Sequence, residues 1–511
     1  MSLKKRLKAI VIIAALAGLV FGVAKYGNQN ETEAELPIFT ESKETVYLWY
    51  TDEVLTSYLS GAAVTYNETH DVRIVPVLTS GLEYLESINQ ASLTEEVPDM
   101  FILTHDSLEK AYLAGLAEEI QPTGGLVLED AYMETGLEAA TYKDKIIGYP
   151  FYFETSSLLY NKTYLEDMAK KQLEAEADLQ AAQEAEQELE ENGPEAAGDA
   201  DEGMPDLPVT GEGAEAAELT EEQKQKIEQK MQEMLPATIE YIKAVADNYD
   251  APDEVEVIFK WDVTDIFYNY FFIGDAINVG GETGWDISQI DIYNQNAIEN
   301  MRVYNELNAF FSIDTGEIDY EKVIDEFVAG KIVFTMATTD VVTKLEQAKE
   351  DGLLTFEYGI TQTPDIDEER KARSLSVTNC VVINGYGENR EAANDFAGFL
   401  TSEYNNILYA RTGKVSSARG VDYGYEALQE FAKEYEDSIS LPKMIETSNF
   451  WVLLEATFAS VWDGADANTS LQELSEQIMK QVTGREYEEQ YIQEKPEPEE
   501  TETVQETASD S

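Results

Sequence analysis

Residues 148–167 read GYPFYFETSSLLYNKTYLED, and this stretch decides the fold. A Gly-Tyr-Pro turn leads into a long aromatic and aliphatic run in which Glu154 is the only charged residue before Lys162. Such a run predicts a buried β-strand. A carboxylate inside it calls for an explanation, because an isolated buried charge is strongly destabilising. One explanation of Glu154 is a Lys or Arg partner at the end of the strand.

The segments around this strand alternate between β-rich and helical patterns. On the N-terminal side, strands are expected from residue 45, over 72–80 and over 98–106, with helical segments between them. On the C-terminal side, helices and strands alternate again, and the aromatic segment 266–281 reads as a helix that closes on glycines. This alternation predicts βαβ units and a parallel sheet, in which ligands bind beyond the carboxyl ends of the strands.

The composition limits the possible functions. The chain has 511 residues, of which 43% are hydrophobic, enough for two or three domains. It has 35 Lys and Arg residues against 101 Asp and Glu residues, and the resulting charge of -66 would repel phosphate backbones, so we expect no nucleic-acid partner. The single cysteine, Cys380, rules out an intramolecular disulfide and is expected to be a buried core residue. With only two histidines as well, we expect no metal and no cofactor.

The two ends of the chain have compositions unlike the rest. Lysines and an arginine precede a short apolar stretch, so residues 1–24 are expected to be a signal peptide or a retained signal anchor that exports the protein to the cell surface. Residues 25–43 would be a polar tether. Residues 485–511 are acidic, have no core pattern and are expected to be a disordered tail.

Residues 168–233 interrupt the alternating pattern. The segment begins with strong helix formers that include few large apolar residues, so we expect a helix without a core face. A Gly-, Pro- and acid-rich linker follows, and a second helix begins where Thr220 and Gln223 have the spacing of a capping box. We interpret 168–233 as an acidic helical hairpin inserted into a compact domain, either as a tolerated surface insertion or as a docking element for a partner.

Four segments resemble, in chain order, the extracellular solute-binding proteins of carbohydrate ABC transporters, the group typified by maltose-binding protein. VPDMFILTHDSLEKAYLAGLAEEI at 97–120 is similar to that family's third strand and following helix. DKIIGYPFYFETSSLLYNKTYLED at 144–167 is similar to its interlobe crossover, in which Glu154 matches the family's cleft-facing carboxylate. The resemblance thus implies a second explanation of Glu154, a cleft filled with water until a sugar replaces it. FVAGKIVFTMATTD at 327–340 and FWVLLEATFASVW at 450–462 are similar to its Gly-Lys strand segment and its aromatic penultimate helix.

The resemblance implies an α/β fold of the two-lobed periplasmic-binding-protein type II class, in which each lobe is a sheet flanked by helices. The first lobe would comprise 44–148 and 375–418, and the second 149–167, 234–374 and 419–484. It also implies capture of a neutral sugar without catalysis, and delivery of that sugar to the membrane permease subunits of an ABC transporter. We expect a monomer, because the high charge opposes association.

A pyranose presents hydroxyl edges and an apolar face, so its site needs carboxylates and other polar groups together with flat aromatic rings. Such residues follow the expected strands or lie on the late helix. Several have structural alternatives: the tryptophans can be core residues, and Asp106 can cap a helix. The candidate ligand-binding residues are Trp49, Tyr50, Asp52, His105, Asp106, Tyr152, Glu154, Trp261, Asp262, Asp265, Trp285 and Trp451.

Two positions depart from the family pattern. The prototype has a tryptophan near the position of Asp340 and an arginine at the position of Ser107, so maltodextrin itself is in doubt as the ligand. Three other functions stay open. The protein could bind a polyamine or a peptide through acids and aromatic rings. It could be a membrane-tethered sensor or interaction module, or it could be a glycosidase with two facing carboxylates.

Overall fold

The computed structural model describes residues 43–94, 97–192 and 220–493, and the described residues from Thr45 onward belong to one compact unit. The expected leader, 1–24, and almost all of the expected tether, 25–43, lie outside the described residues. Within the described ranges, no helix is both long enough and apolar enough to cross a membrane.

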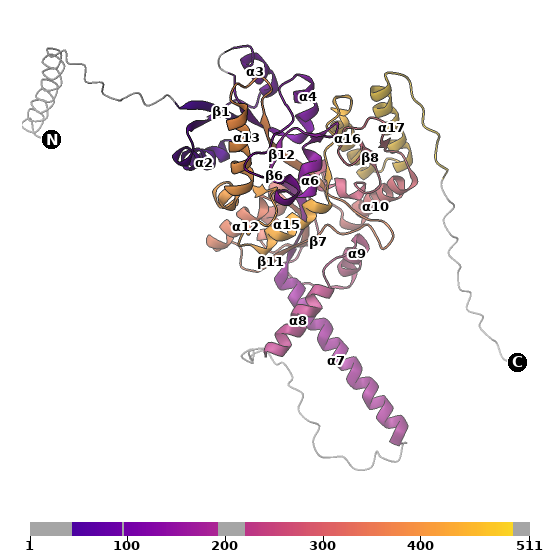
Figure 1. Cartoon of the computed structure of the whole chain (residues 1–511). Helices are drawn as coiled ribbons and strands as arrows, with labels where there is room; N and C mark the ends of the chain where they lie inside the picture. The colour runs from indigo at the N-terminus through magenta and orange to yellow at the C-terminus, as the bar shows by residue number, and fades with distance from the viewer. Residues whose placement is uncertain (1–42, 95–96, 193–219, 494–511) are drawn as a thin grey trace, which may run out of the picture. The chain divides into compact units, whose positions relative to one another are not determined.

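One strand, β6 (Tyr149–Asn161), connects the two halves of the sheet (Figure 1). From Tyr149 to Thr155 it pairs antiparallel with β12 (Leu375–Ile383). From Ser156 onward it pairs with β10 (Ile332–Thr338) and β11 (Tyr358–Thr361). The strand expected within residues 148–167 is therefore confirmed, and the change of partner falls between Thr155 and Ser156.

The first lobe is built around the sheet order β2-β1-β3-β12, with the first part of β6 at its edge. The three strands expected in this region are confirmed, and β1 and β3 run parallel. Their buried side chains, such as Leu48 and Phe101, pack against the helices that follow each strand. The elements are β1 (Glu44–Tyr50), α2 (Thr56–Thr69), β2 (Val72–Leu78), α3 (Tyr84–Ala91), β3 (Met100–Thr104) and α4 (Leu108–Leu113), joined later by α13 (Arg390–Gly398) and α14 (Leu408–Thr412).

The second lobe is built around β7 (Val257–Phe259), β10, β11 and the second part of β6. Several of its helices begin at side-chain caps: Thr238, Asn294 and Asp319 each accept a backbone N–H of the first turn that follows. A single large apolar cluster fills the space between this sheet and its helices. The helices are α9 (Ile239–Asn248), α10 (Gln295–Phe311), α11 (Tyr320–Val328), α12 (Val341–Glu350), α15 (Glu426–Asp437), α16 (Phe450–Trp462) and α17 (Ala467–Thr483).

The fold is thus α/β and two-lobed, with each lobe a sheet flanked by helices. One expected helix is wrong: residues 266–281 form two short 3-10 turns, Ile266–Tyr268 and Tyr270–Phe272, followed by a short strand. A physical reason lies at Asn269, whose side-chain amide donates to the Asp265 carbonyl oxygen at 2.7 Å. In a regular helix that oxygen would accept the backbone N–H of Asn269, which here donates to Ile266 instead. Cys380 is buried, as expected.

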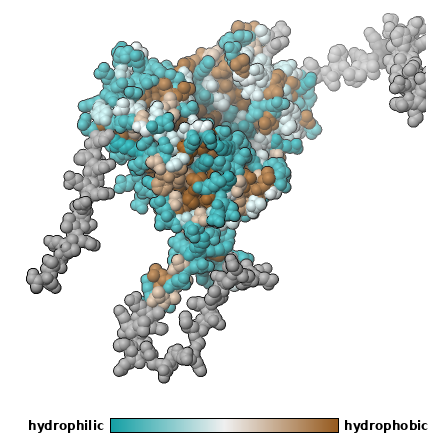
Figure 2. All heavy atoms as spheres, turned by 180° about the vertical axis from the view of Figure 1, so that it is seen from behind, coloured by the Kyte–Doolittle hydropathy of each residue, from teal (hydrophilic) through white to brown (hydrophobic). Residues whose placement is uncertain are grey.

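Two helices, α7 (Lys162–Asn192) and α8 (Glu221–Glu233), flank residues 193–219, which lie outside the described residues. The expected capping box of Thr220 and Gln223 is confirmed. Figure 1 shows α8 lying across the earlier turns of α7, and Figure 2 shows that the described surface there is mostly hydrophilic. The expectation of a helix without a core face is wrong for its start, because Met168 is buried in the second-lobe core and Ile227 and Met231 of α8 are buried with it.

The expected tail beginning at residue 485 also needs correction. Residues up to 493 are described, and several are held against the second lobe. The backbone N–H of Ile492 donates to the Tyr293 hydroxyl at 3.0 Å, and the Ile492 carbonyl accepts from Asn468 at 2.9 Å. Ser475 donates to the Glu489 carboxylate at 2.6 Å. The rest of the expected tail, 494–511, lies outside the described residues.

Candidate functional site

Two cavities, one in each lobe, are lined by charged and aromatic side chains. The first has a volume of about 490 Å³ and is lined by residues of the first lobe and of β6. The second has a volume of about 550 Å³ and is lined by residues of the second lobe, of β6 and of the segment after α14. Their polar and aromatic lining includes Asp52, Glu83, Glu86, Lys110, Tyr152 and Asn379 in the first cavity, and Glu154, Asp265, Tyr268, Tyr320, Asp340, Lys344, Lys414 and Trp451 in the second.

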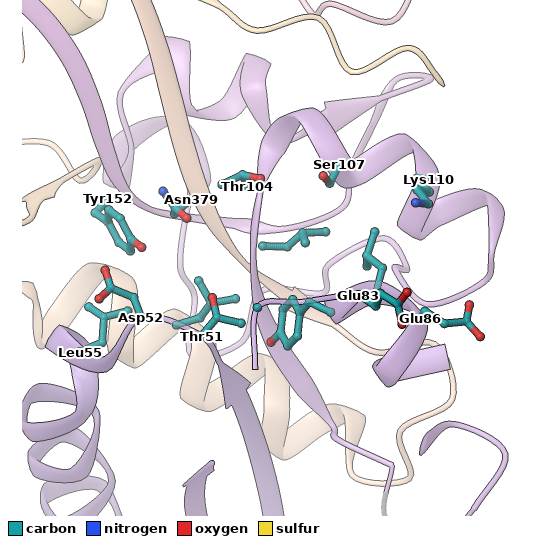
Figure 3. Close-up of a pocket in the computed structure, with 15 residues that line it drawn as sticks. Thr51, Asp52, Leu55, Glu83, Glu86, Thr104, Ser107, Lys110, Tyr152 and Asn379 are labelled. Carbon is teal, nitrogen blue, oxygen red and sulfur yellow. The ribbon is translucent and has the colours of Figure 1, made fainter. Parts of the chain in front are cut away.

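In the first cavity, Asp52 stands where β1 ends. One carboxylate oxygen accepts the backbone N–H of Val54 at 3.0 Å, which caps a short turn and fixes the side chain. Figure 3 shows Asp52 and Tyr152 at one side of this cavity, and Glu83, Glu86 and Lys110 at the other. Charged groups therefore face the cavity from the ends of β1 and from the segments that follow β2 and β3.

Glu83 has a backbone conformation that is unusual for its residue type. Its φ of 51° and ψ of 37° place it in the left-handed region, which is strained for a residue with a side chain. The strain falls at the start of α3, where the chain turns from the end of β2 into the helix and forms part of the cavity wall. Strained residues concentrate at binding sites, so this position supports a functional role for the first cavity.

The second cavity has an aromatic wall. The rings of Tyr268 and Tyr320 stack with centroids 4.7 Å apart and an interplanar angle of 18°. Trp451, on α16, is half-buried, and its ring lies 5.6 Å from that of Tyr270. Flat rings of this kind can pack against the apolar face of a sugar or against another apolar ligand surface.

The same cavity carries paired charges. The Lys344 ammonium lies 2.9 Å from Asp340 and 2.6 Å from Glu321, and it sits 4.6 Å from the centre of the Tyr320 ring. Asp265 accepts the backbone N–H of Phe267 at 2.8 Å. Burial raises the pKa of Asp265 above its usual value, and the nearby Asp262 carboxylate adds to the rise. The hydrogen bond from Phe267 lowers this pKa but does not outweigh burial.

Lys414 joins the two cavities. Its Nζ lies 2.9 Å from Glu154 Oε1 in the second cavity and 3.4 Å from Asp52 in the first, and it sits 5.4 Å from the centre of the Tyr152 ring. The backbone beside it is fixed, because β13 (Val415–Ser416) pairs with β6 at Phe153 and Tyr152. The cavities therefore meet at one lysine held between two carboxylates.

Both explanations of Glu154 apply. It has a basic partner, Lys414, and its side chain also stays 43% exposed toward the second cavity. Burial tends to lower the pKa of Lys414, but Glu154 and then Asp52 outweigh that effect and raise its pKa above the ordinary lysine value.

Four predicted ligand residues lie in the interior, with their polar atoms bound by the protein. Trp261 is fully buried against Phe259 and donates its indole N–H to Asn269 at 2.8 Å. Tyr50 is buried and donates its hydroxyl to Thr56 at 3.0 Å, while Asp262 is buried and accepts from Thr264. His105 is buried between Thr378 and Leu441; burial and the nearby Lys443 lower its pKa to about 4. None of the four lines either cavity, and the structure places all four in the core.

Three further predicted residues are partly exposed but line neither cavity. Trp49 packs against the first-lobe core, and Trp285 meets Tyr142 edge to face at a centroid distance of 5.8 Å. Asp106 lies in a short turn before α4 without capping that helix. The predicted residues that the structure does bring together at the cavities are Asp52, Tyr152, Glu154, Asp265 and Trp451.

Sequence reasoning missed several cavity residues, and some left a signal. Glu83 follows the end of β2, the same kind of position that identified Asp52. Lys414 lies in RTGKVSS, which reads only as a turn, so its pairing with Glu154 could not be foreseen. Asp340 and Ser107, the two departures from the expected pattern, line the second and first cavity respectively. Among the described residues, no cluster of three or more potential metal ligands is found.

Several solved structures with a similar fold hold a bound maltose or maltodextrin. The chain superposes on an extracellular solute-binding protein from Staphylococcus aureus in complex with maltose with a TM-score of 0.64 at 16% identity, covering 86% of this chain and 98% of that one. It superposes on a cyclo/maltodextrin-binding protein complexed with maltotetraose with a TM-score of 0.63 at 16% identity, covering 86% and 98%. For a maltose-binding periplasmic protein from Listeria monocytogenes in complex with maltose, the TM-score is 0.62 at 17% identity, covering 87% and 99%.

Sequence comparison gives no such match. No protein-family model matches the chain, and no curated protein is significantly similar to it. At identities of 16–17%, the structural likeness establishes the two-lobed fold. The ligand has to be argued from the cavities themselves.

Proposed function

We propose that this protein captures a neutral sugar or oligosaccharide between its two lobes and delivers it to the permease of an ABC transporter. The observation that carries the proposal is the meeting of the two cavities at Lys414, with carboxylates and aromatic rings facing them from both lobes. The solved structures of the same fold, which hold maltose or maltotetraose, support it.

The two cavities offer the groups that a polyol requires. Carboxylates such as Asp52 and Glu154 accept hydrogen bonds from hydroxyls, and the ammonium of Lys344 donates to them. Trp451 and Tyr320 offer flat surfaces for the C–H face of a ring. Seven carboxylates and three lysines line the cavities, so phosphorylated or uronic sugars would meet a net negative field.

The location and the partners are part of the proposal. We infer that the N-terminal segment 1–24 exports the protein and either is removed or anchors it at the cell surface. Its partners would be the sugar and the permease subunits. We expect a monomer that does not bind nucleic acid, because a charge of -66 opposes both self-association and contact with phosphate backbones.

A sugar that binds this site should stabilise the protein against heat. Ligand bound only by the folded state adds about 2.7 kcal/mol of stability at a hundredfold excess over Kd. We therefore expect the melting temperature of the exported part of the chain to rise with one class of neutral sugar in a thermal-shift panel of mono- and oligosaccharides. The same sugar should reduce the radius of gyration in solution scattering if the lobes close on it.

An absence of any sugar-dependent shift across such a panel would contradict the proposal, provided that the protein melts cooperatively. Two other results would replace it. Release of shorter sugars from labelled oligosaccharides would indicate a glycosidase, which cleaves between two carboxylates. A shift with a polyamine or peptide alone would indicate a different solute class.

A further inference from the structure

Lys414, the lysine between the two cavities, affects how strongly a charged ligand can bind there. The Lys414 ammonium contacts the carboxylates of Asp52 and Glu154, at 3.4 and 2.9 Å, and its side chain is only 23% exposed. Asp52 comes from the end of β1 and Glu154 from β6, so one ammonium serves carboxylates of two separate elements. It therefore stands where a cation drawn to these acids would bind.

We propose that Lys414 is a specificity-determining residue that weakens the binding of cationic solutes at the two cavities by occupying the carboxylates of Asp52 and Glu154. The inference rests on the proposed function, because it concerns the same two cavities. It explains how a protein with 101 acidic residues can present carboxylates to a ligand and still select an uncharged one.

The selection follows from charge and geometry. A second ammonium at these carboxylates would lie within a few ångströms of Lys414, and like charges repel much more strongly in a partly buried site than in water. A hydroxyl brings no net charge, and it can donate to a carboxylate oxygen that Lys414 leaves accessible. An anion would gain little either, because two carboxylates beside one ammonium leave one net negative charge. That remaining charge still attracts a cation, so Lys414 lowers the affinity for cations and does not abolish it.

The backbone around Lys414 keeps the ammonium in place. Gly413 ends α14 with a φ of 69°, a left-handed conformation that glycine adopts without strain, and Val415 then enters β13. The pairing of β13 with β6 fixes the backbone next to Lys414, and the Lys414 ammonium lies over the ring of Tyr152. The position therefore offers a fixed ammonium, in contrast to lysines such as Lys349, whose ion pair with Glu357 lies at the surface.

The test compares a neutral sugar with an amino sugar that differs from it at one position, and with a cation that is not a sugar. Glucose and glucosamine differ by one hydroxyl replaced by an amine, and spermidine is a cation with no sugar ring. We would measure their Kd values by calorimetry, below the pKa of the amines, for the wild type, Lys414→Met, Lys414→Gln and Lys414→Arg. Lys349→Met is the matched control, because its ion-pair distance of 2.9 Å equals that of Lys414 and Glu154.

The expected result is a gain of about tenfold or more in affinity for glucosamine or spermidine in Lys414→Met and Lys414→Gln. That gain should weaken as salt is added, because it is electrostatic. Lys414→Arg, which keeps the positive charge, and Lys349→Met should both stay at the wild-type value. Using two neutral replacements guards against one of them failing to fold.

The proposal is overturned if both neutral variants fold and neither cation gains affinity, or if the arginine variant gains as much as they do. It is also overturned if the wild type binds spermidine as tightly as Lys414→Met does. These outcomes differ from failure of the proposed function, which shows as absence of sugar binding by the wild type in the thermal-shift panel.

Discussion

Replacing Trp261 by alanine is expected to destabilise the protein by about 3–5 kcal/mol, the cost of removing a fully buried large aromatic side chain. The ring stacks on Phe259 at 4.5 Å and meets Trp462 edge to face at 5.7 Å, and its N–H donates to Asn269. Truncation would leave a cavity in the second-lobe core and an Asn269 oxygen without that donor. Urea denaturation of the purified variant would measure the loss.

Trp451→Ala is the matched comparison, because this tryptophan is half-buried at the second cavity. We expect it to destabilise the protein much less than Trp261→Ala does, and to weaken sugar binding by about tenfold or more, as truncation of a central aromatic contact does. Calorimetry with the sugar found in the thermal-shift panel would check this. Equal stability losses in the two variants, or unchanged sugar affinity in Trp451→Ala, would contradict the separation of core from ligand surface.

The second large effect is expected at Lys443, a lysine that is 1% exposed. Its ammonium donates to the carbonyl oxygens of Glu138 and Thr141, at 3.1 and 3.0 Å, and to that of Thr283. Burial lowers the pKa of Lys443 to about 7, and the nearby Cys380, Glu138 and Glu109 only partly offset this.

This depressed pKa makes stability depend on pH in a defined direction. In the unfolded chain a lysine keeps its proton up to about pH 10.4, so between about pH 7 and that value unfolding takes up a proton. The contribution of Lys443 to stability is therefore smallest below about pH 7 and grows as the pH rises, by about 1.4 kcal/mol per pH unit. Lys443→Met removes this titration and should remove the slope.

The measurement is the free energy of unfolding in urea at several values between about pH 7 and pH 9, below the range where unfolded tyrosines titrate. The difference between the wild type and Lys443→Met cancels the contributions of distant titrating groups, which are common to both proteins. His105, whose pKa Lys443 helps to lower to about 4, stays neutral over this range in the wild type. Lys433→Met, at an exposed ion pair on α15, should keep the wild-type slope. Parallel pH dependences for the wild type and Lys443→Met would show that Lys443 does not titrate in this range.

The fold was largely predictable because its signals are local and strong. The long apolar run around Glu154 and the alternation of strands and helices in the first lobe were confirmed as β6 and as β1 to α4. The helix expected over 266–281 was wrong, because the side chain of Asn269 takes the carbonyl oxygen that a helix would pair with its backbone N–H. Asn can compete with the backbone in this way, but the sequence does not reveal the direction of its side chain.

The residues that line the cavities were predictable only where a residue follows a strand or faces away from the core. Asp52 and Glu154 met that condition. Trp261 also follows a strand, but its ring turns into the core, and residue type alone does not reveal that direction. Lys414 was missed because its partners are far from it in the sequence. Glu154 is 260 residues away, and Asp52 is further still. Long-range ion pairs are fixed by the folded chain path and cannot be read from spacing.

Because β6 is shared by the two lobes, Glu154 lies close to the point about which one lobe would rotate against the other. Glu154 lies one residue before the point where the strand exchanges β12 for β10 and β11 as partners. In a rotation about that point, atoms near the axis travel least, while the far walls of the cavities travel most. If the lobes close on a solute as the proposed function requires, a solute bound at Glu154 would keep this contact throughout the rotation, and recognition would come before enclosure.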